Sequence, residues 1–196
     1  MGVVSSRHQM SPWQRWHQAV REAGVAVMLH VTASLYVGGH LRPDIFFKSI
    51  QELGLEKYNA VFNKIQQKTI AKSGPAGNYD IAEAALNEDF DITLHFRLQQ
   101  HVCGLAPLNS HPWYNKRELE NKLYRLNKLR NEVSHRTVEI TEDQLDEKLR
   151  GLQELLFSIL DHVDFLIDDN CLSVRARVIE IIQGLSEESS MDECCV

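Results

Sequence analysis

Apolar residues recur every three or four positions along most of this chain, which is the spacing of one face of an α-helix. The first such run begins at Pro12 and ends before Gly38, with Gly24 at the one position where the apolar face is interrupted. A second helix is expected from Pro43 to the region of Gly54. The apolar face of the first run consists of Trp13, Trp16, Val20, Val27, Val31 and Leu35.

The next two apolar runs predict two more helices. One should pass through Tyr58, Phe62, Ile65 and Ile70, and the stretch SGPAGN at 73–78 should form a loop after it. The other should extend from Ile92 to Cys103, where a following glycine ends the pattern.

The second half of the chain predicts three elements after a loop at 108–115. TEDQ at 141–144 is typical of a capping box, so a helix should begin at residue 142 and continue to about residue 168. A last helix should cover 173–185. The helix that precedes the capping box has an apolar face made of Leu119, Leu123, Leu126, Leu129 and Val133. Strand patterns are nearly absent, so the prediction is an all-α fold, a single bundle of about five to six helices.

Length and composition indicate one domain. The chain has 196 residues, of which 43% are hydrophobic, enough for a single core. Residues 1–11 are expected to form a flexible tail, 12–185 the helical domain and 186–196 an acidic disordered tail. No apolar run approaches the ~20 residues of a membrane span, and the start lacks a secretory signal pattern, so a cytoplasmic protein is expected.

Cysteine and histidine spacing predicts no metal centre and no cofactor. The four cysteines form no CxxC pair, and they should be reduced thiols. His30, His95 and His101 have no partners at zinc spacing, so core or surface positions are expected for them. The tryptophans are assigned to packing rather than to base stacking.

Charge is distributed unevenly although the net charge is -6. The segment 116–136 is rich in lysine and arginine, and the segment 139–169 is rich in acids. A basic helix of this kind attracts a phosphate backbone, and it can also simply pack beside the acidic helix. The candidate RNA-binding residues are Lys122, Arg125, Lys128 and Arg136.

The stretch LRNEVSH at 129–135 contains the residue types of a phosphate-handling site. Arg130 would bind phosphate charge, His135 would act as acid or base, and Asn131 lies one helical turn before His135. The alternative is structural: Asn131 and His135 bond backbone groups at the helix end, and Arg130 pairs with an acid such as Glu139.

Two blocks together resemble a known family. FDITLHFRLQQHVCGLAP at 90–107, followed by LRNEVSH and the TEDQ helix start, is similar to the HEPN branch of the DAZ-interacting zinc-finger ubiquitin ligase and of invertebrate NACHT-type receptors. The resemblance implies a small helical bundle that commonly dimerises. It also places Arg130, Asn131 and His135 at the motif positions of a metal-independent RNA-cleaving site. Four residues separate Arg130 from His135, one fewer than is common in this branch.

Three functions follow from the resemblance. The first is a dimeric interaction or regulatory module in intracellular signalling or innate defence, with protein partners. The second is an endoribonuclease that cuts single-stranded RNA to a 2′,3′-cyclic phosphate, with His135 as base and Arg130 bound to the phosphorane. If the helix frays at His135, the three side chains can converge, and a symmetric dimer with two motifs side by side would add a general acid. The third is binding of RNA or nucleotide without cleavage.

The N-terminus contains a separate candidate signal. MGVVSS fits the pattern of N-myristoylation at Gly2, and Arg7, Arg15 and Arg21 precede any acidic residue. A single acyl chain holds a membrane only marginally, so these arginines would be needed for peripheral membrane contact. The alternative is an unmodified start.

Overall fold

The computed structural model describes residues 10–35, 43–72, 90–103, 116–135, 138–163 and 171–187. All regular elements in these ranges are α-helices, which confirms the predicted all-α class. The described residues form eight helices rather than five to six. They are α1 (Pro12–Leu35), α2 (Pro43–Glu52), α3 (Leu55–Val61), α4 (Lys64–Lys72), α6 (Ile92–His101), α7 (Lys116–His135), α8 (Glu142–Leu160) and α9 (Cys171–Glu187).

The helix predicted over 58–70 is two helices, because the chain breaks at Phe62-Asn63. Phe62 is extended, with φ -107 and ψ 125. The side-chain oxygen of Asn63 accepts hydrogen bonds from the backbone N–H of Ile65 at 3.0 Å and of Gln66 at 2.9 Å. Asparagine followed three residues later by glutamine is a local capping pattern, and it begins α4 here. The apolar periodicity continues across this break, so the sequence pattern did not predict it.

The predicted start of α8 is confirmed and its predicted end is wrong. The Thr141 side chain accepts from Gln144 N–H at 3.3 Å, and the Gln144 side chain accepts from Thr141 N–H at 3.0 Å. The helix ends at Leu160 because the next turn tightens: Val163 N–H donates to the Leu160 carbonyl at 2.8 Å. Helix α9 continues to Glu187, two residues past its predicted end.

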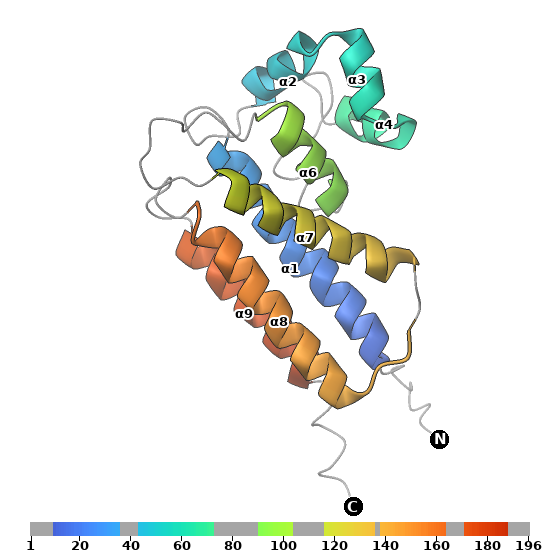
Figure 1. The fold of residues 1–196 in the computed structure, drawn as a ribbon, viewed down its shortest axis with the longest axis vertical. Helices are drawn as coiled ribbons and strands as arrows, with labels where there is room; N and C mark the ends of the chain where they lie inside the picture. Colours follow the sequence, from blue (N-terminus) through green and yellow to red (C-terminus); the bar gives the residue numbers. More distant parts are fainter. Residues whose placement is uncertain are drawn as a thin grey trace, which may run out of the picture.

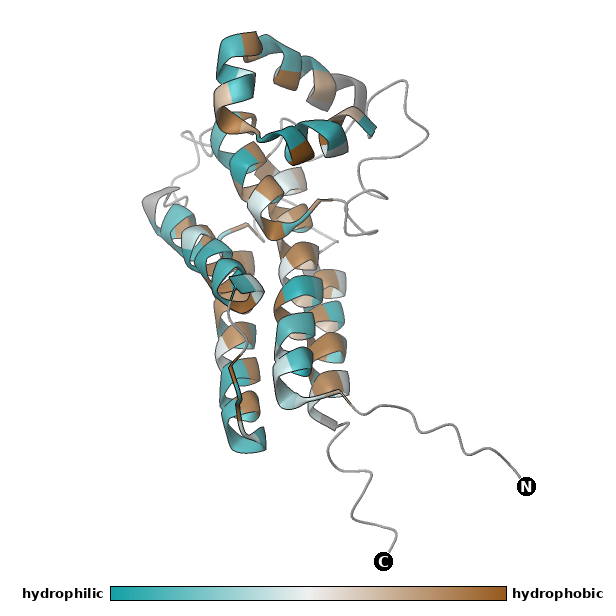
Figure 2. Ribbon diagram, turned by 90° about the vertical axis from the view of Figure 1, so that its right-hand side faces the viewer, coloured by the Kyte–Doolittle hydropathy of each residue, from teal (hydrophilic) through white to brown (hydrophobic). Residues whose placement is uncertain are grey.

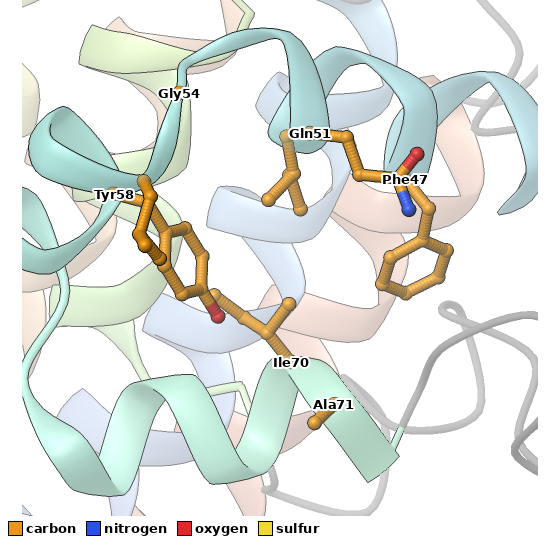
Figure 3. A pocket seen from close by; sticks show the side chains of 8 residues that line it. Phe47, Gln51, Gly54, Tyr58, Ile70 and Ala71 are labelled. Carbon is orange, nitrogen blue, oxygen red and sulfur yellow. The ribbon is translucent and has the colours of Figure 1, made fainter.

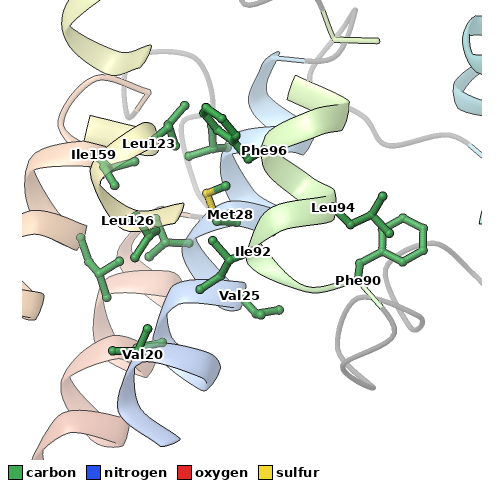
Figure 4. Packing of buried hydrophobic residues seen from close by; sticks show 14 of the residues in the cluster. Val20, Val25, Met28, Phe90, Ile92, Leu94, Phe96, Leu123, Leu126 and Ile159 are labelled. Atoms are coloured by element: carbon green, nitrogen blue, oxygen red, sulfur yellow. The ribbon is translucent and has the colours of Figure 1, made fainter. Parts of the chain in front are cut away.

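Helix α1 is the centre of the bundle. It packs against α6, α7, α8 and α9, while α2, α3 and α4 lie together at one end (Figure 1). Apolar and polar positions alternate around each helix (Figure 2), and the apolar side chains meet in one core between α1, α6, α7 and α8 (Figure 4). Fully buried core residues from these helices include Val20, Met28, Leu98, Leu123, Leu126 and Ile159.

Gly24 allows a close approach of α6 to α1 within this core. A β-carbon at this position would lie 2.6 Å from Cδ1 of Ile92 in α6 and 3.6 Å from Cδ1 of Leu126 in α7. The interruption in the apolar pattern of α1 is therefore the place where Ile92 of α6 occupies the space of a missing side chain, with Leu126 of α7 in ordinary contact beside it.

Arg15 joins the far ends of three helices. Its guanidinium donates to the Leu185 carbonyl of α9 at 2.9 Å and to the Glu142 carboxylate of α8 at 2.5 Å, and the side chain is 3% exposed. A buried arginine needs both its charge and its N–H groups satisfied, and these two partners contribute to both. The expectation that Arg15 faces anionic lipid is wrong, because its charge is used inside the fold.

Comparison of two alanine substitutions tests the close approach at Gly24. Gly151 of α8 has open space around it, so Gly151→Ala should raise the free energy of unfolding by about 0.5–1 kcal/mol through helix propensity. Gly24→Ala should not, because overpacking costs about 1–3 kcal/mol. Urea unfolding of both variants measures this difference. Equal stabilisation at the two positions would contradict the packing argument.

Candidate functional site

The side chain of Arg130 is turned toward α6. One guanidinium nitrogen, Nη2, lies 2.5 Å from Oδ2 of Asp91, and Nη1 donates to the Asn131 side-chain oxygen at 3.2 Å. Arg130 therefore pairs with an acid, as the structural alternative expected, but the acid is Asp91 and not Glu139, the example given for it. Two of the predicted site residues, Arg130 and Asn131, are in contact.

Asp91 has two roles at the start of α6. Its Oδ1 accepts from the backbone N–H of Leu94 at 2.8 Å, which caps the helix, while its other oxygen binds Arg130. The same carboxylate therefore fixes the first turn of α6 and orients a guanidinium of α7. Sequence reasoning placed Asp91 before a helix but did not assign it to the site.

His135 lies on a different side of α7 from Arg130. The helix includes His135 as its last residue, so the fraying that would bring the side chains together is not seen. Five residues along an unbroken helix place His135 about 140° around the axis from Arg130. His135 is exposed, and it shares the exposed side of α7 with Lys128 and Glu132. One chain thus brings Arg130 and Asn131 together but not Arg130 and His135.

A cavity of about 150 Å³ lies between α1, α6 and α7 beside Arg130. Two residues of α1, His17 and Arg21, line it together with Arg130 and Asp91. The sequence prediction missed His17 and Arg21. Their spacing of one helical turn was visible, but their proximity to Arg130 depends on how α1 packs against α7. The remaining lining residues are Val20, Val25, Ile92, Val133 and Ser134.

Lys122 is held by the neighbouring helix and is not on an open RNA-binding surface. Its ammonium group donates to the Ser158 carbonyl of α8 at 3.2 Å and lies 3.4 Å from the Glu118 carboxylate. Hydrogen bonding to Lys122, the charge of Lys122 and the nearby His162 lower the pKa of Glu118. For Lys122 the packing alternative is the one observed.

The other RNA-binding candidates differ in their surroundings. Arg125 is exposed on α7. Lys128 is also exposed, and its ammonium group lies 3.8 Å from Glu132 one turn later. Arg136 lies outside the described residues. Of the three candidates that the structure describes, Arg125 and Lys128 are exposed and Lys122 packs against α8.

A buried polar network joins α1 to α6. The Thr32 hydroxyl donates to the Met28 carbonyl at 2.8 Å, so it accepts from Gln99 Nε2 at 3.1 Å and from His95 Nδ1 at 3.1 Å. Burial lowers the pKa of His95 to about 3. His95 is therefore a neutral core residue at physiological pH, as the lack of ligand spacing suggested.

A larger cavity of about 350 Å³ is formed by α2, α3 and α4 (Figure 3). Its lining residues carry no charge, and Tyr58, whose pKa burial raises, contributes one hydroxyl. Gly54 at its edge has φ +78, a conformation that favours glycine. This cavity offers apolar contact and does not join the Arg130 cluster.

Other candidate chemistry is limited in the part of the chain that the structure describes. Within it, no group of three or more histidine, cysteine or acidic side chains is placed to hold a metal ion. Cys103 is buried with a free thiol, and burial raises its pKa to about 12. No described helix is both long enough and apolar enough to cross a membrane. Gly2 lies outside the described residues, so its lipidation stays a prediction.

Comparisons with protein-family models, with curated proteins and with solved structures found no match.

The buried state of His95 predicts a pH dependence of folding. Its pKa is about 3 in the folded chain and about 6.5 when unfolded. Neutral His95 therefore contributes stability that is fully present above pH ~6.5 and is lost as the pH falls toward 3, by up to about 1.4 kcal/mol per pH unit. Urea unfolding of the wild type and of His95→Gln between pH 7 and 5 measures the difference in slope. Identical slopes would show that His95 does not titrate on unfolding.

Proposed function

We propose that this chain is a HEPN-like interaction module that pairs with a second copy of itself and serves intracellular signalling or innate defence. The proposed contact surface is the α7 outer face, which we define as Tyr124, Arg125, Lys128, Glu132 and His135. All of these side chains are exposed. Their spacing of three, four and seven residues places them along one side of the helix.

The position of Arg130 is the observation that supports this proposal most. Because its guanidinium is paired with Asp91 and His135 points elsewhere, one chain does not assemble an arginine–histidine pair. His135 is left on a surface where a second chain can reach it. The resemblance to a commonly dimeric family agrees with this arrangement.

The chemistry of the α7 outer face suits pairing of identical chains. Tyr124 is 57% exposed, and its ring lies 6.4 Å from that of Phe96, so an aromatic group of α6 supports it. Lys128 and Glu132 carry opposite charges one turn apart. In a two-fold antiparallel pairing of α7 helices, Lys128 of each chain faces Glu132 of the other. Such charges set orientation and specificity more than affinity.

Charge reversal tests this pairing. Lys128→Glu and Glu132→Lys should each weaken self-association, because like charges would face each other across the two-fold axis. An equimolar mixture of the two variants should associate, since every cross-pair is then attractive. Light scattering coupled to size exclusion, at tens of micromolar protein, measures the mass.

Lys68→Glu in α4 is the matched control, because it reverses one exposed lysine away from α7. It should behave like the wild type. The proposed contact would be refuted by a wild type that stays monomeric at the 22.5 kDa chain mass, or by variants that associate as well alone as when mixed.

Metal-independent RNA cleavage is the second candidate function, and the exposure of His135 favours it. In this case His135 of one chain would act on RNA held with groups of the other chain, so cleavage would require the dimer. The nucleophile would be a ribose 2′-hydroxyl, and the products a 2′,3′-cyclic phosphate and a 5′-hydroxyl.

An RNA assay separates the two candidates. For an interaction module we expect labelled single-stranded RNA to stay intact with purified wild-type protein in EDTA. The His135→Ala variant should give the same result. Cleavage by the wild type that is lost in His135→Ala would instead establish the ribonuclease function and displace the first proposal.

A further inference from the structure

We propose that the cavity formed by α2, α3 and α4 binds an uncharged apolar molecule that carries one hydrogen-bond-accepting oxygen. The volume of this cavity, about 350 Å³, lies within the ~300–1,000 Å³ of small-molecule sites. It is about twelve times the ~30 Å³ that a water molecule occupies in the liquid, and a methylene group is similar in size. The cavity uses no residue of the α7 outer face or of the LRNEVSH stretch, so this inference goes beyond the proposed function.

The walls of the cavity are apolar. Phe47 and Ile50 of α2 and Ile70 of α4 are buried and form its closed side. Figure 3 shows Tyr58 on one side of the space and Phe47 on the other, with Ile70 between them. None of the lining residues carries a charge. Because a charge buried without a partner is costly, these walls favour an uncharged ligand.

Helix α3 lacks the buried packing that normally stabilises a short helix. It has seven residues, and none of them is buried. Leu55 and Tyr58, which lie one turn apart, line the cavity, and Leu55 is 76% exposed. A helix of this length is marginal in water without tertiary contacts. An apolar molecule in the cavity would supply contacts that this side of α3 lacks.

The Tyr58 hydroxyl is the polar group that orients the ligand. It points into the cavity beside Ile70 (Figure 3). The Tyr58 ring packs against Phe62, with ring centroids 5.3 Å apart, but no described residue forms a hydrogen bond with the hydroxyl. Burial raises the pKa of Tyr58, so the hydroxyl keeps its proton at neutral pH. It can therefore donate this proton in a hydrogen bond to a ligand oxygen.

Charges around the cavity do not select an acid or a base. Lysines and glutamates that are adjacent in sequence to lining residues are nearly balanced in number, and all of them are exposed. They are Lys48, Lys57, Lys72, Glu52 and Glu56. A surface with both signs interspersed creates little net field, so it attracts neither a fatty acid nor a cationic ligand strongly.

Titration with 1-hexanol, 1-octanol and 1-decanol, followed by the amide chemical shifts of the full chain in NMR spectra, tests the proposal. We expect one saturable site with a Kd below about 0.1 mM for 1-decanol. Affinity should rise about three- to fourfold for each added methylene group, because each one buries further apolar surface. The largest shifts should fall in α2, α3 and α4. No saturable binding of 1-decanol, or shifts centred on other helices, overturns the proposal.

Sodium decanoate tests the preference for an uncharged ligand. It has a chain of the same carbon number as 1-decanol, but its carboxylate is ionised at neutral pH. We expect it to bind at least about tenfold more weakly than 1-decanol, because the walls offer no cation to a buried carboxylate. Equal or tighter binding of decanoate would assign the cavity to a fatty acid and overturn the proposed ligand class.

Two matched substitutions locate the bound alcohol. Ala71 of α4 lines the cavity, so Ala71→Phe should occupy part of it and weaken 1-decanol binding more than about tenfold. Ala60→Phe makes the same change at an exposed position of α3 outside the lining, and its affinity should stay within about twofold of the wild type. Equal affinities of the two variants would overturn the location.

Tyr58→Phe tests the role of the hydroxyl. Loss of one hydrogen bond should weaken the binding of every alcohol by the same factor, about fivefold. The gain in affinity per methylene group should stay the same, because the apolar walls remain. Unchanged affinity, or an altered gain per methylene group, would overturn the orienting role of Tyr58.

Hydrogen exchange and self-association complete the test. Saturating 1-decanol should slow amide exchange in α3 relative to α8, because the ligand adds contacts to α3. Light scattering should give Ala71→Phe the same mass as the wild type, since the α7 outer face is unchanged. Unaltered exchange in α3 would contradict the proposed contacts. A changed mass would assign the cavity to contact with a second copy and overturn the proposal.

Discussion

The contact between Gly24 and Ile92 is the constraint on which the position of the candidate site depends. Because Gly24 has no side chain, the first residue of α6 packs directly against α1, and Leu126 of α7 lies beside it. Asp91 immediately precedes Ile92, so the same contact places the capping carboxylate within reach of Arg130. A β-carbon at Gly24 would lie 2.6 Å from the buried Cδ1 methyl of Ile92, so this methyl would have to shift.

The continuity of α7 divides its chemistry between two sides. An unbroken helix through His135 keeps Arg130 facing α1 and α6, and leaves His135 with the exposed charged residues on the opposite side. The helix provides one side for the cavity lined by Arg130 and Arg21, and its exposed side carries the proposed contact with a second chain.

Helix starts were more predictable from the sequence than the neighbours of the side chains on each helix face. Pro12, Pro43 and the Thr141 capping box mark helix starts that the structure confirms, because these signals act within one turn. The break at Asn63 had the same kind of local signal, but the uninterrupted apolar periodicity concealed it. In the candidate site Arg130 and Asn131 do lie together, while Lys122 faces α8 and Arg15 is buried.

The sequence alone determined the helical class and most helix starts, since periodicity and capping depend on residues within about four positions of one another. Only the tertiary structure decided which groups meet. Asp91 reaches Arg130 from 39 residues away, and Arg15 reaches Glu142 from 127 residues away. His17 and Arg21 join the site because α1 packs against α7. Which residues become partners depends on how whole helices pack against one another. No local pattern in a single sequence specifies that packing.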